Sequence, residues 1–478
     1  TLLRNSHFVS LLRPVDNYAQ TERSVKYGIL VIALTLLSVY LVELTLRRRG
    51  GSINLLHYVL TGLSLVLFYT LLLSMSEVIG FGLASGAAVL IAQYWGKRDM
   101  PRIRQIIALS LRFALGAAVL FTLVGRLFPV QVLRIFSTDA AVIEAGAAYL
   151  EWLAVSFVFY SFSNCYIMCL RAVEQVRVSM VIYSCSFFVN VFFNYCFIFG
   201  KLGAPALGVR GAALGTILAR LFECAAALVY MCFIEKRVRF TPRWLVKFRS
   251  GLFRDYIRNS VPVVSNELLW ALGLAVINLT IGRMGASFTS AVSIVNVVNN
   301  LVSVFIFGMA NATAVVVGKT IGEGRLRDAH RAANSTVVVS LALSFVCTAL
   351  LLAGRTPIMS LYRVSAEAYS ISVSLLTILA FIQPFQAVGA VMVVGVLRGG
   401  GDVRTNLLLD SGLMWALAIP LGLLGGFVFH WSAPLVFFCM RCDNIVKSIV
   451  GLFRLRSGKW IRVVTRPDSQ PGSPEGFS

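Results

Sequence analysis

The sequence predicts an all-α, polytopic membrane protein. Of its 478 residues, 58% are hydrophobic and only 13% are charged, whereas soluble domains carry about 25% charged residues. Apolar runs long enough to cross ~30 Å of hydrocarbon recur along nearly the whole chain. Two stretches of sequence also repeat at one spacing, which predicts two related halves.

Thirteen apolar runs can be drawn, which predicts 12 or 13 transmembrane helices. A short polar turn at Ser76, Glu77 and Gly80 separates the second run from the third, and a continuous helix there reduces the count to twelve. The runs cover residues 27–46, 55–74, 78–95, 106–126, 146–170, 178–200, 207–233, 258–281, 287–316, 330–353, 366–397, 404–427 and 430–453.

Basic clusters occupy alternate connections between these runs, as the positive-inside bias requires of short cytoplasmic loops. They include RRR at 47–49, GKRDMPRIR at 96–104 and LRGGGDVR at 397–404, in which GGGD is expected to form a turn. With thirteen spans, this pattern places the N-terminus outside and the C-terminus in the cytoplasm. With twelve, residues 1–46 re-orient and RRR lies outside, so the charge bias favours the turn. The expected location is the inner cell membrane.

The basic charge and the reactive side chains give no sign of nucleic acid or of catalysis. The net charge is +22, but the Lys and Arg residues are spread in short clusters between apolar runs, which is a topological pattern. The nine cysteines lie in or beside apolar runs, and the four histidines are scattered. We therefore expect no enzyme, no cofactor, no metal site other than a Na⁺ site, no nucleic acid and no protein partner. Membrane lipid and a small organic substrate are the expected partners.

An internal repeat predicts two pseudo-symmetric halves of six helices each. FGLASGAAVLIAQYWGKRD at 81–99 resembles FGMANATAVVVGKTIGEGR at 307–325, and LRAVEQVR at 170–177 resembles LRGGGDVR at 397–404. An even number of spans per half gives both copies the same orientation, which suits alternating access. The pairs Gly82/Gly86 and Gly308/Ala312 have the small-xxx-small spacing that allows close helix approach.

From about residue 80 to 466 the chain resembles the MATE (multidrug and toxic compound extrusion) family. Four further motifs carry the resemblance, together with the stretch at 81–99: LGVRGAALGTILARLFE at 207–223, VPVVSNELLWALG at 261–273, GVLRGGGDVR at 395–404 and LRSGKWIRVVT at 455–465. The resemblance implies a twelve-helix antiporter that exchanges an organic, often cationic, compound for H⁺ or Na⁺. It also implies a substrate cavity between the two halves.

The preceding residues resemble a different family, the CreD-type inner-membrane proteins. LLRPVDNYAQTERSVKYGILVIALT at 11–35 and GLSLVLFYTLLLSMSEVIGF at 62–81 carry this likeness. The chain then looks like a chimera in which the first MATE helix is replaced. The expected organisation is an extracytoplasmic segment at 1–26, a CreD-like transmembrane segment at 27–75, an N-lobe at 76–235, a cytoplasmic linker at 236–257, a C-lobe at 258–465 and a disordered tail at 466–478.

Glu267 is the leading candidate for coupling transport to a cation. It lies near the middle of the run at 258–281, beside Asn266 and one turn before Trp270. An ionisable group inside a span is costly and is therefore a candidate site by default. A carboxylate in a low-dielectric cavity can take up and release a proton near neutral pH, and loss of its charge would release a bound organic cation. The alternative is a packed Glu that a neighbouring helix satisfies.

Other charged residues inside the runs are expected to form structural ion pairs. Arg220 and Glu223 are one helical turn apart, and Asp443 and Lys447 have the i,i+4 spacing. Asp410 lies within two turns of the cytoplasmic end and is expected to reach water.

Amide side chains in several runs are candidates for lining the cavity, or equally for joining one helix to another. They are Asn190, Asn194, Asn296, Asn299, Asn300, Gln383 and Gln386.

These features favour a cation-coupled exporter of drugs or metabolites. Two alternatives stay open. One is a non-transporting chimeric membrane protein with at most an envelope-integrity role. The other is a lipid-linked flippase, which requires a more charged cavity than the sequence leads us to expect.

Overall fold

The computed structural model describes residues 78–466 apart from short gaps at 135–146, 148–149, 152, 206, 208, 247–249, 361 and 363. The runs predicted at 27–46 and 55–74, together with Ser76 and Glu77 of the predicted turn, lie outside the described residues. The choice between 12 and 13 spans therefore stays a prediction.

The described residues form helices and loops without a strand, which confirms the all-α class. The first described helix, Val78–Gly96, is followed by α4 (Met100–Leu127), α5 (Pro129–Arg134), α7 (Ser156–Ala172), α8 (Val176–Phe199), α9 (Val209–Val229), η1 (Tyr230–Ile234), α10 (Arg243–Val246) and η2 (Ser250–Leu252). The second half contains α11 (Phe253–Arg283), α12 (Ala286–Gly322), α13 (Leu326–Ser360), α14 (Ala366–Ala390), η3 (Val391–Leu397), α15 (Val403–Leu407), η4 (Leu408–Gly412), η5 (Met414–Ala418), α16 (Ile419–Leu423), η6 (Leu424–Val428), α17 (Ala433–Cys439) and α18 (Asp443–Arg456).

The described residues of the apolar runs from residue 78 onward lie mostly in helices. Within the described ranges, nine helices are long and apolar enough to cross a membrane. The last run differs from its prediction, because residues 440–442 form a turn that separates α17 from α18. This interruption places Arg441 at a helix break inside a span.

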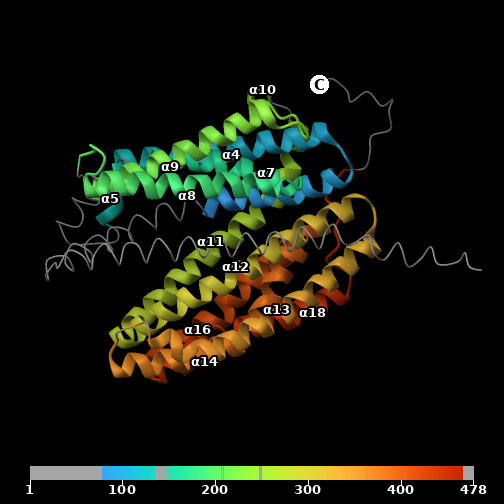
Figure 1. The fold of residues 1–478 in the computed structure, drawn as a ribbon. Coiled ribbons are helices and arrows are strands. Elements are labelled where there is room, and N and C mark those ends of the chain that lie inside the picture. The colour runs from blue at the N-terminus through green and yellow to red at the C-terminus, as the bar shows by residue number, and fades with distance from the viewer. Residues whose placement is uncertain are drawn as a thin grey trace, which may run out of the picture.

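The two halves form two helix bundles, and α11 crosses from one to the other (Figure 1). Near the start of α11, Tyr256 is buried in the apolar core of the first bundle. Near its end, Ile281 is buried in a core of the second bundle. The predicted boundary at residues 257–258 therefore falls within a helix that belongs to both bundles.

The repeated stretches fold alike. The backbone N–H of Gln175 donates to the carbonyl of Leu170, and that of Asp402 donates to Leu397 across the same spacing, both at 2.9 Å. The turn in the first copy has Glu174 at φ 63°, where the second copy has Gly401 at φ 82°. Only glycine adopts this left-handed conformation without steric cost, so the second copy has the less strained turn.

Glycines bring the two halves into close contact at the basic end. A Cβ added to Gly322 at the end of α12 would lie 1.9 Å from the backbone oxygen of Gln93, and one added to Gly96 would lie 2.2 Å from the oxygen of Lys319. In the first small-xxx-small pair, a Cβ added to Gly86 would lie 2.6 Å from the Cα of Ser260 in α11. Gly308 has open space around it, so the second predicted pair does not mediate a close contact.

Gly322→Ala is expected to lower the melting temperature of the purified protein, whereas Gly308→Ala leaves it unchanged. The added methyl group at residue 322 meets a backbone oxygen that cannot move away without separating the helices. Overpacking of this kind costs typically about 1–3 kcal/mol. Thermal unfolding of both variants in the same detergent measures the difference, and equal melting temperatures would contradict the close contact.

Candidate functional site

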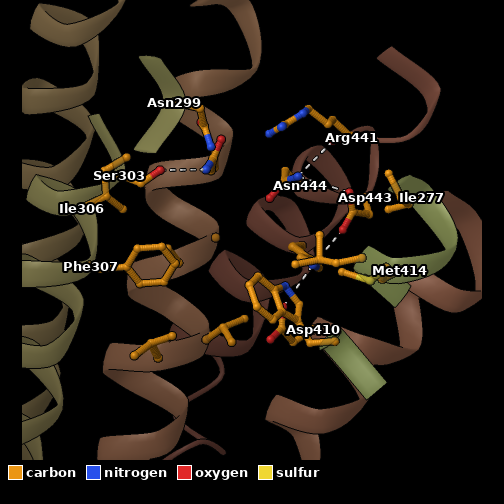
Figure 2. Close-up of a pocket in the computed structure, with 18 of the residues that line it drawn as sticks. Ile277, Asn299, Ser303, Ile306, Phe307, Asp410, Met414, Arg441, Asp443 and Asn444 are labelled. Atoms are coloured by element: carbon orange, nitrogen blue, oxygen red, sulfur yellow. Dashed lines mark hydrogen bonds and ion pairs between the residues drawn. The ribbon is translucent and has the colours of Figure 1, made fainter. Parts of the chain in front are cut away.

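A cavity of about 450 Å³ lies among the helices of the second half (Figure 2). Its lining comes from α11, α12, α14, η3, η4, η5, α17 and α18, with Phe81 from the first described helix. The sequence led us to expect a cavity between the two halves, but this one lies within the C-terminal half. Its charged lining residues are Glu267, Arg398, Asp410, Arg441, Asp443 and Lys447.

Glu267 lines this cavity and forms an ion pair with Arg398. The other guanidinium nitrogen of Arg398 donates to the hydroxyl of Ser85 at 3.3 Å. Ser85 belongs to the first described helix, whereas Glu267 belongs to α11, so Arg398 connects the cavity to the first half. Glu267 thus faces the cavity and is also paired by a neighbouring segment, so both interpretations of this residue stay open.

The sequence predicts Arg398 in a cytoplasmic loop and gives no sign that it reaches the cavity. Arg398 is 4% exposed. The loop that follows it is covered by the chain after α18, because Gly400 packs against Trp460 and the backbone N–H of Arg462 donates to the carbonyl of Gly400 at 2.8 Å. The covering residues are some 60 positions away in sequence, so no local pattern indicated this burial.

The neighbours of Glu267 have different roles. Trp270 lines the cavity. Asn266 is 1% exposed and lies outside the lining; its amide nitrogen donates to Asp410 at 3.0 Å, and its amide oxygen accepts from Ser411 at 2.9 Å. Asn266 therefore joins α11 to η4 and holds Asp410 in place.

Lys447 forms ion pairs with two carboxylates at the cavity wall. Its Nζ lies 2.7 Å from Asp443 and 3.0 Å from Asp410. The expected pair between Asp443 and Lys447 is present. Asp410 is 17% exposed and lines the cavity, where Lys447 and Asn266 hold its carboxylate, so its contact with water stays a prediction.

The predicted amides of the second half lie at the cavity, with one exception. Asn296, Asn299, Asn300 and Gln386 line it, whereas Gln383 is fully buried outside the lining. Asn296 accepts a hydrogen bond from Arg441 at 3.2 Å.

The predicted residues of the first half lie outside this cavity. Asn194 donates to Asn190 at 3.0 Å on α8, and Gly215 of α9 packs against Asn194. The predicted ion pair of Arg220 with Glu223 is present at 2.9 Å, and Glu223 is fully buried. These four side chains serve contacts among the helices of the first half.

The basic end contains charged contacts that the sequence reasoning also missed. Asp402 of the GGGD turn is fully buried and pairs with Arg454 at 2.6 Å and with Arg462 at 3.0 Å. Lys319 of α12 pairs with Glu174 of the first half at 2.7 Å. The turn was correctly predicted, but its carboxylate binds α18 and the chain after it and does not face solvent.

Comparisons with known proteins agree with this architecture. Residues 262–424 match the MatE family model, and residues 2–126 match the model described as inner membrane protein CreD. The CreD match therefore extends beyond residue 80 into the described helices. The probable multidrug resistance protein NorM of Thermotoga maritima is 26% identical over 394 residues, which are 82% of this chain and 84% of that protein. The probable multidrug resistance protein YoeA of Bacillus subtilis is 24% identical over 71% of this chain and 73% of its own length.

Solved structures share the fold. A crystal structure of MATE in the straight conformation superposes with a TM-score of 0.79 at 19% identity, covering 93% of this chain and 97% of that one. An outward-facing multidrug resistance MATE family transporter of the MOP superfamily gives a TM-score of 0.78 at 19% identity, covering 92% and 96%. The chain is therefore similar to membrane transporters of the MATE family over most of its length, and its N-terminal region is similar to inner membrane protein CreD.

Proposed function

We propose that this chain is an antiporter of the inner cell membrane that exports organic, mostly cationic, drugs or metabolites in exchange for H⁺ or Na⁺. The names of its relatives support multidrug export. The observation that carries the coupling is the position of Arg398, which contacts both Glu267 in the cavity and Ser85 in the first half.

In this mechanism a coupling cation and the substrate compete for Glu267. A proton or Na⁺ on the carboxylate removes the counter-ion of Arg398, and the guanidinium must then find another partner. Arg398 also donates a hydrogen bond to Ser85 of the first half. A change of partner for its guanidinium therefore alters the contact between the two halves. Alternating access requires the halves to move relative to each other, and the ion pair links that movement to the occupancy of Glu267. The basic end faces the cytoplasm.

Efflux driven by imposed gradients tests this function. The full chain is reconstituted in liposomes with tetramethylrhodamine methyl ester, a fluorescent organic cation, and a proton or Na⁺ gradient is imposed. Dye movement against its own gradient is expected with one of the two cations and should stop when an ionophore dissipates that gradient. Movement that is indifferent to both gradients would exclude the antiport.

One observation favours the lipid-linked flippase as a second candidate. The cavity contains six charged side chains, which is more than the sequence led us to expect. Five of them, two cations and three carboxylates, pair with one another, which leaves little free charge for a pyrophosphate and weakens this reading. Gradient-independent translocation of a fluorescent lipid-linked pyrophosphate in the same liposomes would support the flippase, and the absence of such translocation would exclude it.

A further inference from the structure

Arg441 differs from the other charged residues at the cavity. Arg398 pairs with Glu267, and Lys447 pairs with both Asp410 and Asp443. Among the described residues, these pairs use all three carboxylates of the cavity lining, and none of them lies within ion-pair distance of Arg441. The lining therefore presents one guanidinium without an anionic partner.

The surroundings of Arg441 hold its guanidinium in the cavity. The residue lies in the break between α17 and α18, where the backbone turns. One nitrogen donates to Asn296 of α12, and the guanidinium lies over the ring of Phe437 with its carbon 4.8 Å from the ring centre. Figure 2 shows it extending across the cavity toward Asn299. The remaining N–H groups therefore border the space that a ligand would fill.

Arg441 lies inside a span, where keeping a charged side chain costs free energy. A charged side chain within the membrane is disfavoured by several kcal/mol unless it is paired or faces a polar cavity, and such residues mark substrate or ion pathways. A guanidinium presents two parallel donors that match a carboxylate in a bidentate arrangement. Asn296 accepts from only one of these donors, and Asp443, the carboxylate nearest in sequence, pairs directly with Lys447, so the other donors of Arg441 have no direct anionic partner among the described residues.

We propose that Arg441 binds a carboxylate of the transported compound, so that the substrates of this site are amphoteric. This inference rests on the proposed function for the cationic part of the substrate, which is assigned to Glu267. Both residues line the same cavity, so one molecule with a cationic and an anionic group can contact both. A substrate of this kind adds no net charge to the cavity.

Equilibrium binding to the purified full chain tests the proposal with two dyes that differ in one group. Tetramethylrhodamine carries a free carboxylate and is a zwitterion, whereas its methyl ester is a cation of almost the same shape. Arg441→Gln is expected to weaken binding of the acid at least tenfold and to change binding of the ester less than twofold, because only the acid loses a charged hydrogen bond. Arg441→Lys keeps the charge and should lose less. Fluorescence anisotropy measures both affinities.

Arg355→Gln is the matched control. Arg355 lies on α13, donates to Thr377 and is absent from the cavity lining. Both dyes should bind this variant as they bind the unmodified chain. Equal losses of acid and ester in Arg441→Gln, or no loss of either, would overturn the proposal.

Two further comparisons separate the proposed contact from a folding defect and from a loss of transport. If Arg441→Gln does not fold, the affinities of the unmodified protein still test the proposal. The unmodified protein should bind the acid at least fivefold more tightly than the ester. Tighter binding of the ester would overturn the proposal. Binding needs no ion gradient. A chain that binds the acid through Arg441 but moves no dye would therefore contradict the antiport while leaving this inference intact.

Discussion

Glu267→Gln is expected to reduce gradient-driven efflux at least tenfold and to remove its dependence on the proton or Na⁺ gradient. Glutamine keeps the shape of the side chain but can neither carry the charge that pairs with Arg398 nor bind and release a proton. Arg398 is then left buried with Ser85 as a neutral partner. Efflux of tetramethylrhodamine methyl ester from liposomes with an imposed gradient measures the effect.

Glu367→Gln provides the comparison. Glu367 is an exposed carboxylate in the first turn of α14 that accepts a hydrogen bond from Ser287, and it lies away from the cavity. The same chemical change there should leave efflux at the level of the unmodified chain. Gradient-coupled efflux at the full rate in Glu267→Gln would remove this residue from the coupling mechanism.

The helices could be predicted from the sequence because lipid imposes a length and a composition on each span. Backbone polar groups in hydrocarbon must be satisfied within the segment, so a run of about 20 apolar residues has few alternatives to a helix. The break at residues 440–442 could not be predicted in this way, because it borders a cavity, where irregular backbone structure is tolerated. Composition alone does not distinguish a residue that faces lipid from one that faces such a cavity.

The site was only partly predictable, and the misses have a common cause. Glu267 was found because a charge within an apolar run is conspicuous. Its partner Arg398 and the buried carboxylate Asp402 lie in a basic loop, and the positive-inside bias treats such loops as solvated. Their burial depends on contacts with Trp460 and Arg462, which follow the loop in the chain after two further spans. Contacts at this separation leave no periodic signal.

For the amides of the first half, the sequence left two roles open. Asn190 and Asn194 were proposed as cavity residues because they are polar groups one turn apart in a span. The structure pairs them with each other on α8. An amide pair at i,i+4 forms a local hydrogen bond and helps helices pack, so its presence in a span does not by itself indicate a binding site.

Lys447→Met is expected to destabilise the protein by about 3–5 kcal/mol, the cost typical of removing one partner of a buried ion pair. Lys447 pairs with both Asp410 and Asp443, and its own side chain is 6% exposed. Methionine fills a similar volume but leaves two negative charges close together at low dielectric. Thermal unfolding of the purified protein should show a large fall in melting temperature.

Two comparisons separate this charge effect from loss of packing. Lys236→Met replaces an exposed lysine beyond the end of η1 and should change the melting temperature little. Adding Asp410→Asn to Lys447→Met removes one of the two unpaired charges and should restore part of the lost stability, because the remaining carboxylate no longer faces a like charge. If the double variant melts at or below the single variant, repulsion between the two carboxylates is not the cause. The role of Lys447 would then lie in the packing of α18 against the cavity wall.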